Sequence, residues 1–135
     1  TGFLAKHYNM YSIEHDKDFV NKYKSNYVHA PIVTYDKTDF LAPSGIPGQR
    51  GWYDPNIVKP FLDKIEKYDL ILVDGPIGQV HGRGGFYKYL HWFNTDVTIM
   101  IDDCNRSEEK ILLEKVSEKL NKSYIMLDDD TGVIL

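Results

Sequence analysis

The stretch that decides the fold is Tyr68-Asp69-Leu70-Ile71-Leu72-Val73-Asp74-Gly75-Pro76. Its four consecutive apolar residues are bounded by turn residues, a pattern typical of a short strand buried on both faces of a sheet. A similar apolar run at residues 97–101 precedes Asp102 and Asp103. Helical patterns separate these runs, and the alternation of strands with helices predicts parallel strands joined by crossover connections.

Outward from these runs, the chain predicts an α/β fold with a mostly parallel sheet, helices on both faces and a C-terminal antiparallel hairpin. The expected strands are residues 10–13, 27–33, 70–73 and 97–101, with 124–127 and 132–135 as the hairpin. The expected helices are residues 3–8, 17–24, 56–67 and 86–93, and a long helix with Ser107 as its N-cap. Residues 34–55 hold three Gly and three Pro and are expected to form a long loop.

Length and composition limit the classes of protein to consider. The chain has 135 residues, a net charge of −4 and a single cysteine, Cys104. This length suits one domain, residues 1–135, with a core that needs no disulfide. Because the chain has neither a basic block nor an apolar run of about 20 residues, we expect no nucleic-acid or membrane partner. No signal peptide is visible at Thr1 and one cysteine fits a reducing compartment, so we expect a cytoplasmic protein.

Acidic residues follow three of the expected strands, although a sheet does not need them there. Glu14, Asp74 and the pair Asp102 and Asp103 come directly after apolar runs. Ligands of parallel sheets bind at the carboxyl ends of the strands. A carboxylate in that place can accept hydrogen bonds from both hydroxyls of a ribose, which is the functional interpretation of Glu14. The alternative is an acidic residue at the start of the next helix.

Three segments occur in an order that resembles the class I S-adenosylmethionine-dependent methyltransferases, which have a Rossmann-like fold. They are Tyr11-Ser12-Ile13-Glu14-His15-Asp16, Tyr68-Asp69-Leu70-Ile71-Leu72-Val73-Asp74-Gly75-Pro76 and Val97-Thr98-Ile99-Met100-Ile101-Asp102-Asp103. The closing pair of strands is similar to the antiparallel hairpin of this family. The resemblance covers nearly the whole chain, and only the complete set of segments is specific. It implies transfer of a methyl group from S-adenosylmethionine to an oxygen or nitrogen atom of a small polar molecule.

The chain departs from this family at its N-terminus. The first strand of the family and its glycine-rich turn, which holds the methionine part of the cofactor, would lie before Thr1. By the family's strand order, that strand would lie between residues 10–13 and 70–73. Without it both neighbouring strands would expose unpaired edges. We therefore expect residues 1–135 to be a single methyltransferase-like domain that is incomplete at its N-terminus.

The resemblance also implies residues around the cofactor. Glu14 would hold the ribose with His15 beside it, while Ala30 and Pro31 would line the adenine pocket. Asp74 would contact the amino group of the cofactor or act as a general base, unless Asp-Gly-Pro serves only as a turn. The full implied set is Gly2, Glu14, His15, Ala30, Pro31, Asp74 and Gly75.

A divalent cation is a further implication, because some O-methyltransferases of this class bind one through acids at the ends of these same two strands. Asp74 with Asp102 or Asp103, and with Asn105, would offer the oxygen ligands that Mg²⁺ prefers. The alternative is that Asp102, Asp103 and Asn105 cap the long helix, with Arg106 balancing their charge.

A glycine-rich loop at residues 75–85 follows the strand that ends in Asp74. Its glycines let backbone amides approach an anion, and the Arg83 side chain is suited to a carboxylate or phosphate. His81 is a candidate proton acceptor near neutral pH. The candidate catalytic residues are therefore Asp74, His81 and Asp102. The alternative is that the loop is a flexible connector.

The sequence leaves two other functions open. A non-catalytic methyltransferase-like binding module would account for the departure at the N-terminus. Another nucleotide-binding Rossmann enzyme, such as an NAD(P)-dependent reductase, would share the strand pattern. The main expectation is an enzyme with a small-molecule substrate, and the oligomeric state stays open, a homo-oligomer included.

Overall fold

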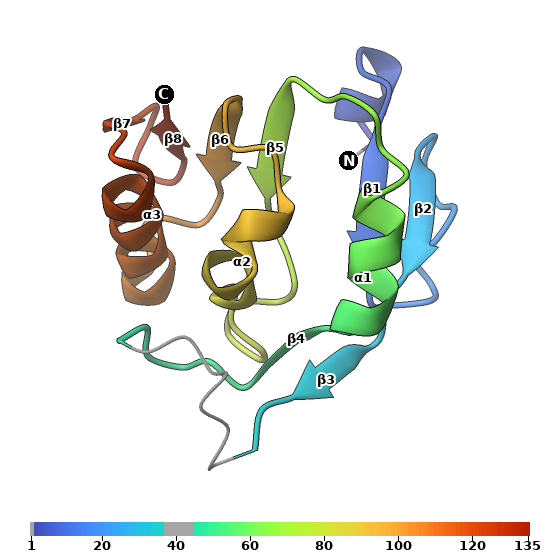
Figure 1. Ribbon diagram of the computed structural model, residues 1–135, viewed down its shortest axis with the longest axis horizontal. Helices are drawn as coiled ribbons and strands as arrows, with labels where there is room; N and C mark the ends of the chain where they lie inside the picture. The colour runs from blue at the N-terminus through green and yellow to red at the C-terminus, as the bar shows by residue number, and fades with distance from the viewer. Residues whose placement is uncertain (1, 37–44) are drawn as a thin grey trace.

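A computed structural model describes residues 2–36 and 45–135 of the chain. The strands are β1 (Tyr11–Glu14), β2 (Asn26–His29), β3 (Ile32–Thr34), β4 (Gly51–Tyr53), β5 (Leu70–Val73), β6 (Thr98–Ile101), β7 (Tyr124–Met126) and β8 (Gly132–Ile134). The α-helices are α1 (Pro55–Leu62), α2 (Gly85–Lys88) and α3 (Ser107–Leu120), and the short 3₁₀ helices are η1 (Leu4–Lys6) and η2 (Leu90–Trp92). Figure 1 shows how they are arranged.

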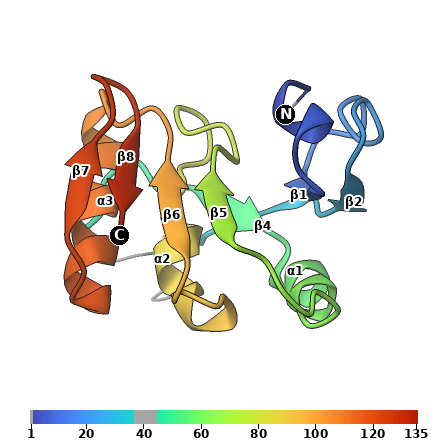
Figure 2. The same ribbon diagram turned by 90° about the horizontal axis from the view of Figure 1, so that it is seen from above.

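The strands form three small sheets, so the predicted Rossmann-like fold with one mostly parallel sheet is wrong. β1 pairs with β2 in parallel, β3 with β4 antiparallel, and the largest sheet is mixed, in the order β5-β6-β8-β7. Only the β5–β6 pair of that sheet is parallel. The predicted C-terminal hairpin is confirmed, since β7 pairs antiparallel with β8. The predicted helices on both faces are also wrong, because α2 and α3 lie on the same face of the four-stranded sheet (Figure 2).

One proline explains part of this difference. Residues 27–33 do not form one strand: β2 ends at His29, and β3 begins at Ile32, after Pro31. Proline has no N–H for a ladder, so pairing with β1 stops there. β3 then pairs with β4, with Val33 opposite Trp52. The predicted loop 34–55 therefore contains a strand, although residues 37–44 lie outside the described part of the chain.

Several helix boundaries also differ from the prediction. Residues 17–24 form turns, and α1 is eight residues long, capped by the Asp54 carboxylate, which accepts a hydrogen bond from the Asn56 N–H at 2.9 Å. The predicted helix 86–93 is split into α2 and η2. α3 begins at Ser107, but its N-cap is Arg106, and the Ser107 hydroxyl donates to the Glu108 carboxylate instead.

The core lies between the four-stranded sheet and the helices. Ile99 and Ile101 of β6 and Leu113 of α3 are completely buried. On β5, however, Leu70 and Leu72 are 37% and 39% exposed, so the prediction of a strand buried on both faces is wrong. The reason is that the helices cover only one face of this sheet (Figure 2).

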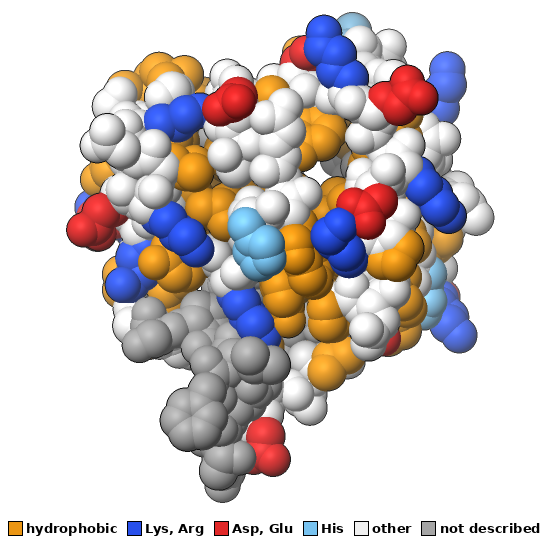
Figure 3. Space-filling view, in the orientation of Figure 1, with side chains coloured by type: hydrophobic (Ala, Val, Ile, Leu, Met, Phe, Trp, Pro, Cys, Tyr) orange, Lys and Arg blue, Asp and Glu red, His pale blue; other side chains and the backbone are white. Residues whose placement is uncertain are grey.

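The surface gives little further indication of a partner. Of the helices in the described part of the chain, none combines the length and apolarity of a membrane span. On the face seen in Figure 3, Lys and Arg side chains are scattered among acidic and apolar ones.

Candidate functional site

The end of β1 places Glu14 and His15 at one side of the candidate site. One Glu14 carboxylate oxygen, Oε1, accepts hydrogen bonds from the backbone N–H groups of His15 and Asp16 at 2.7 and 2.9 Å. The same oxygen lies 3.1 Å from Nδ1 of His15. Within the described ranges, the hydrogen bonds to the Glu14 carboxylate all go to Oε1.

Tyr53 connects the end of β1 to the end of β5. Its side chain is 7% exposed, and its hydroxyl lies so close to Gly75 that a side chain at position 75 would have no room. The rings of Tyr53 and His15 are 6.2 Å apart. Burial raises the pKa of the Tyr53 hydroxyl far above its usual range. The negative charges of Glu14 and Asp74 raise it further, against the opposing effect of Arg83, so the hydroxyl is a permanent hydrogen-bond donor at neutral pH.

His81 completes this group from the glycine-rich loop. Its ring meets the His15 ring edge-on, with centroids 5.6 Å apart. The His81 carbonyl oxygen accepts hydrogen bonds from the backbone N–H groups of Arg50 and Gly51, which hold the loop against β4. Burial lowers the pKa of His81, and the nearby charge of His15 lowers it further, so His81 is neutral at pH 7 and able to accept a proton. We call Glu14, His15, Tyr53, Asp74 and His81 the β1–β5 site.

The acidic residues at the ends of β5 and β6 also come together. Asp74, Asp102 and Asp103 each bring a carboxylate oxygen within 4.8 Å of the others. Burial raises the pKa of Asp74 and Arg83 lowers it, while the charges of Asp102 and Asp103 and a hydrogen bond with Asp102 raise it again. Asp74 therefore belongs both to the β1–β5 site and to this cluster, which we call the aspartate cluster.

Arg83 lies inside the aspartate cluster and is not available to a substrate. Its side chain is 4% exposed, and it donates to the Asp103 carboxylate at 2.5 Å and to the Asp102 carbonyl oxygen at 2.7 Å. The predicted role of Arg83 in holding an external anion therefore has no support in its position. Because its guanidinium already supplies a positive charge between the carboxylates of Asp74 and Asp103, the cluster as folded does not fit the expected Mg²⁺.

Of the other implied cofactor residues, Gly2 lies apart from the β1–β5 site, whereas Ala30 and Pro31 adjoin it. The Ala30 N–H donates to the Glu14 carbonyl oxygen, and the Pro31 carbonyl oxygen accepts from the Asp54 N–H, both at 2.8 Å. Gly2 packs against the ring of Tyr23. The side chain of Ala30 is fully buried in the core, which leaves no surface for an adenine ring. Pro31 is exposed where the chain turns into β3. Glu14, His15, Asp74 and Gly75 lie around Tyr53, and the cofactor contacts implied for them stay predictions.

The sequence analysis did not predict two buried residues near these sites: Tyr53 of the β1–β5 site, and Glu109 of α3 beside the glycine-rich loop. Tyr53 came from a segment interpreted as a loop, although Gly51-Trp52-Tyr53 contains two residues that favour strands. Glu109 is 2% exposed, and its Oε2 atom has no hydrogen-bond partner in the described part of the chain. The sequence did contain a signal for its burial. Glu109 precedes Leu112, Leu113 and Val116 by three, four and seven residues, which is the spacing of residues on one face of a helix.

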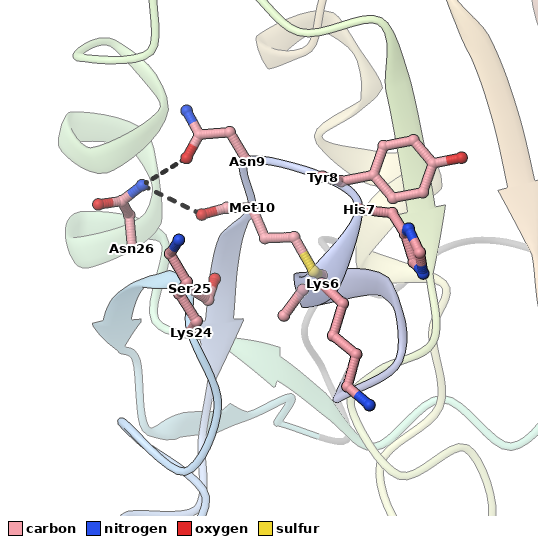
Figure 4. A pocket seen from close by; sticks show the side chains of 9 residues that line it. Lys6, His7, Tyr8, Asn9, Met10, Lys24, Ser25 and Asn26 are labelled. Carbon is pink, nitrogen blue, oxygen red and sulfur yellow. Dashed lines mark hydrogen bonds between the residues drawn. The ribbon is translucent and has the colours of Figure 1, made fainter.

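A hollow in the surface lies elsewhere. It measures about 510 Å³ and is found where β1 and β2 begin, at the opposite end of β1 from Glu14. Figure 4 shows Asn26 beside it, with its amide directed to Asn9 and to the Met10 carbonyl oxygen. None of the residues that line it is a predicted site residue, and we assign it no function.

Comparison with known proteins adds no family. No protein-family model matches the chain, and a search of the curated proteins finds no match either.

Proposed function

We propose that this protein transfers a methyl group from S-adenosylmethionine to an oxygen or nitrogen atom of a small polar molecule, in the cytoplasm. The observation that carries the proposal is the convergence of the ends of β1 and β5 around the Tyr53 hydroxyl. It brings Glu14, His15, Asp74 and Gly75, which lie far apart in the sequence, into one neighbourhood with His81.

Each residue of the β1–β5 site has a role that its surroundings support. The Oε2 atom of Glu14 accepts hydrogen bonds from ribose hydroxyls, because Oε1 is already occupied by the turn after β1. Tyr53 keeps its proton, so its hydroxyl, which feels the charges of both Glu14 and Asp74, is a hydrogen-bond donor. S-adenosylmethionine supplies an electrophilic methyl group when bound.

The acceptor needs a base only if it is a hydroxyl or a protonated amine. His81 is neutral at pH 7 and can take that proton. Asp74 is the second candidate, with a side chain that is 55% exposed and therefore reachable. Asp102 is the weakest of the three predicted catalytic residues, because Arg83 and Asp74 already occupy its surroundings.

Calorimetric titration of S-adenosylhomocysteine into the full-length protein tests this proposal. We expect binding, with an affinity reduced about tenfold to hundredfold by Glu14→Gln, because hydrogen bonds to a charged group contribute about 1.5–3 kcal/mol. Asp18→Asn is the matched control, since it removes an exposed acid four residues away. NADH is the comparison ligand.

Each result has a clear meaning. Binding that Glu14→Gln reduces and Asp18→Asn leaves unchanged supports the proposal. Binding of NADH in its place would favour another nucleotide-binding enzyme. If neither ligand binds to folded protein, the proposal fails, and a non-catalytic binding module becomes the better interpretation.

A further inference from the structure

The aspartate cluster has the oxygen atoms of a cation site but is arranged around an arginine. Asp74, Asp102 and Asp103 come from the ends of two neighbouring parallel strands, and their carboxylate oxygens lie within 4.8 Å of one another. Three carboxylates at such distances repel one another unless positive charge lies between them. Hard divalent cations such as Mg²⁺ and Mn²⁺ prefer oxygen ligands of this kind.

The positive charge is supplied from the glycine-rich loop. Nη2 of Arg83 lies 2.5 Å from Asp103 Oδ2 and 3.5 Å from Asp74 Oδ1. Nη1 donates to the Asp102 carbonyl oxygen at 2.7 Å, and Nε to the Pro76 carbonyl oxygen at 3.3 Å. All three guanidinium nitrogens therefore have partners at the ends of β5 and β6, and the side chain is only 4% exposed.

A second arginine approaches from the outside. Arg106 contacts the other oxygen of Asp103, at 2.9 Å, and its side chain is 33% exposed. Arg106 therefore lies at the rim, whereas Nη2 of Arg83 lies between the carboxylates of Asp74 and Asp103, where a cation shared by these two would lie.

We propose that Arg83 takes the place of a divalent cation, so that the aspartate cluster does not bind one in the natural protein but does so once the guanidinium is removed. Arg83 is then a positioning residue: it fixes the glycine-rich loop, and with it His81, to the ends of β5 and β6. This inference does not depend on the proposed methyl transfer, because it concerns only the charges of the folded chain.

Mn²⁺ binding to the full-length protein, followed by the electron paramagnetic resonance signal of the free ion, tests this inference. We expect Arg83→Gln to bind Mn²⁺ about tenfold or more tightly than the natural protein, because one positive charge leaves the cluster. Arg83→Lys keeps the charge and should behave like the natural protein. Arg106→Gln removes a positive charge from the same Asp103 but not from the centre, and should give a smaller gain. Adding Asp102→Asn to Arg83→Gln should abolish the gain.

Two results would overturn the inference. One is tight Mn²⁺ binding by the natural protein that Asp102→Asn removes, since the cluster would then be a cation site despite Arg83. The other is a folded Arg83→Gln variant that gains no affinity. If Arg83→Gln does not fold, the natural protein and its Asp102→Asn variant decide the question alone: equal, weak binding supports the inference, and loss of binding in the variant overturns it.

Discussion

Acidic residues lie at the ends of both β1 and the β5–β6 pair, but different groups contact their negative charges at the two places. At β5 and β6 the carboxylates of Asp74 and Asp103 contact Arg83, which is 4% exposed, and Arg106 adds a second positive charge. At β1 the Glu14 carboxylate lies beside the His15 ring, with Oε1 3.1 Å from Nδ1. In the first arrangement a buried guanidinium contacts the carboxylates, while in the second the carboxylate oxygen Oε1 is held by two backbone N–H groups. An acid at the end of a strand is therefore weak evidence for a ligand site where a cation of the chain contacts it.

The largest expected effect on stability comes from removing the Arg83 charge at the ends of β5 and β6. Arg83→Met should lower the free energy of unfolding by about 3 kcal/mol, because breaking a buried ion pair leaves an uncompensated charge. Glu14→Gln should change it by less than about 1 kcal/mol, because its pair is partly exposed. Urea unfolding at pH 7 measures both values. Similar losses for the two variants would mean that the two ends do not differ as described.

Substitution of Glu109 is expected to have an intermediate effect on the free energy of unfolding, with the opposite sign to that of Arg83→Met. Its carboxyl lies against Gly78 of the glycine-rich loop, beside Arg106, and burial raises its pKa. An acid whose pKa is raised by folding contributes stability below its unfolded pKa and loses that contribution as the pH rises above it. Glu109→Gln should therefore stabilise the protein by about 1 kcal/mol at pH 8 and have little effect at pH 4, in urea unfolding.

Glu108 is the matched control for this prediction. Hydrogen bonds from its own backbone N–H and from Ser107 lower its pKa, so its charged form is favoured by folding. Glu108→Gln should therefore lower stability slightly above its unfolded pKa, where Glu109→Gln raises it. Destabilisation by both variants at pH 8 would show that the Glu109 carboxylate has a partner.

The smallest expected effect on stability concerns the two histidines of the β1–β5 site, His15 and His81. Because folding lowers the pKa of His81, protonation is less favourable in the folded state, and stability should fall as the pH drops through the usual histidine range. The loss between pH 7.5 and 5.5 should be only a few tenths of a kcal/mol, since solvent screens a partly buried ring. His81→Gln should remove this pH dependence, and His15→Gln should weaken it. An unchanged pH profile in both variants would contradict the coupling of the two rings.

Local patterns predicted the parts of the fold that local physics determines. The apolar runs that became β5 and β6, the closing hairpin and the long helix are all present, because each is encoded within a few residues. The pairing of the sheets was not predictable in this way. The pairing of strands depends on Pro31, which stops the hydrogen-bonded ladder between β1 and β2. It also depends on β4, whose three residues lie in a stretch rich in glycine and proline.

The candidate site shows the same division. The acids at strand ends were visible as residues that a sheet does not require, and four of the implied cofactor residues do come together. The burial of Arg83 was not visible, because a glycine-rich loop with one arginine is equally consistent with binding an anion. Only the distances from Arg83 to Asp102 and Asp103, about 20 residues further along the chain, distinguish the two interpretations.

The burial of Arg83 has a consequence for the integrity of the chain. In the sequence alone, Gly82-Arg83-Gly84 is a cleavage site for a protease that cuts after arginine, since the small neighbouring residues leave the peptide bond accessible. In the folded protein that arginine cannot enter the specificity pocket of such an enzyme without first leaving Asp103 and the Asp102 carbonyl oxygen. The contacts that balance the aspartate cluster thus also protect this loop from being cut.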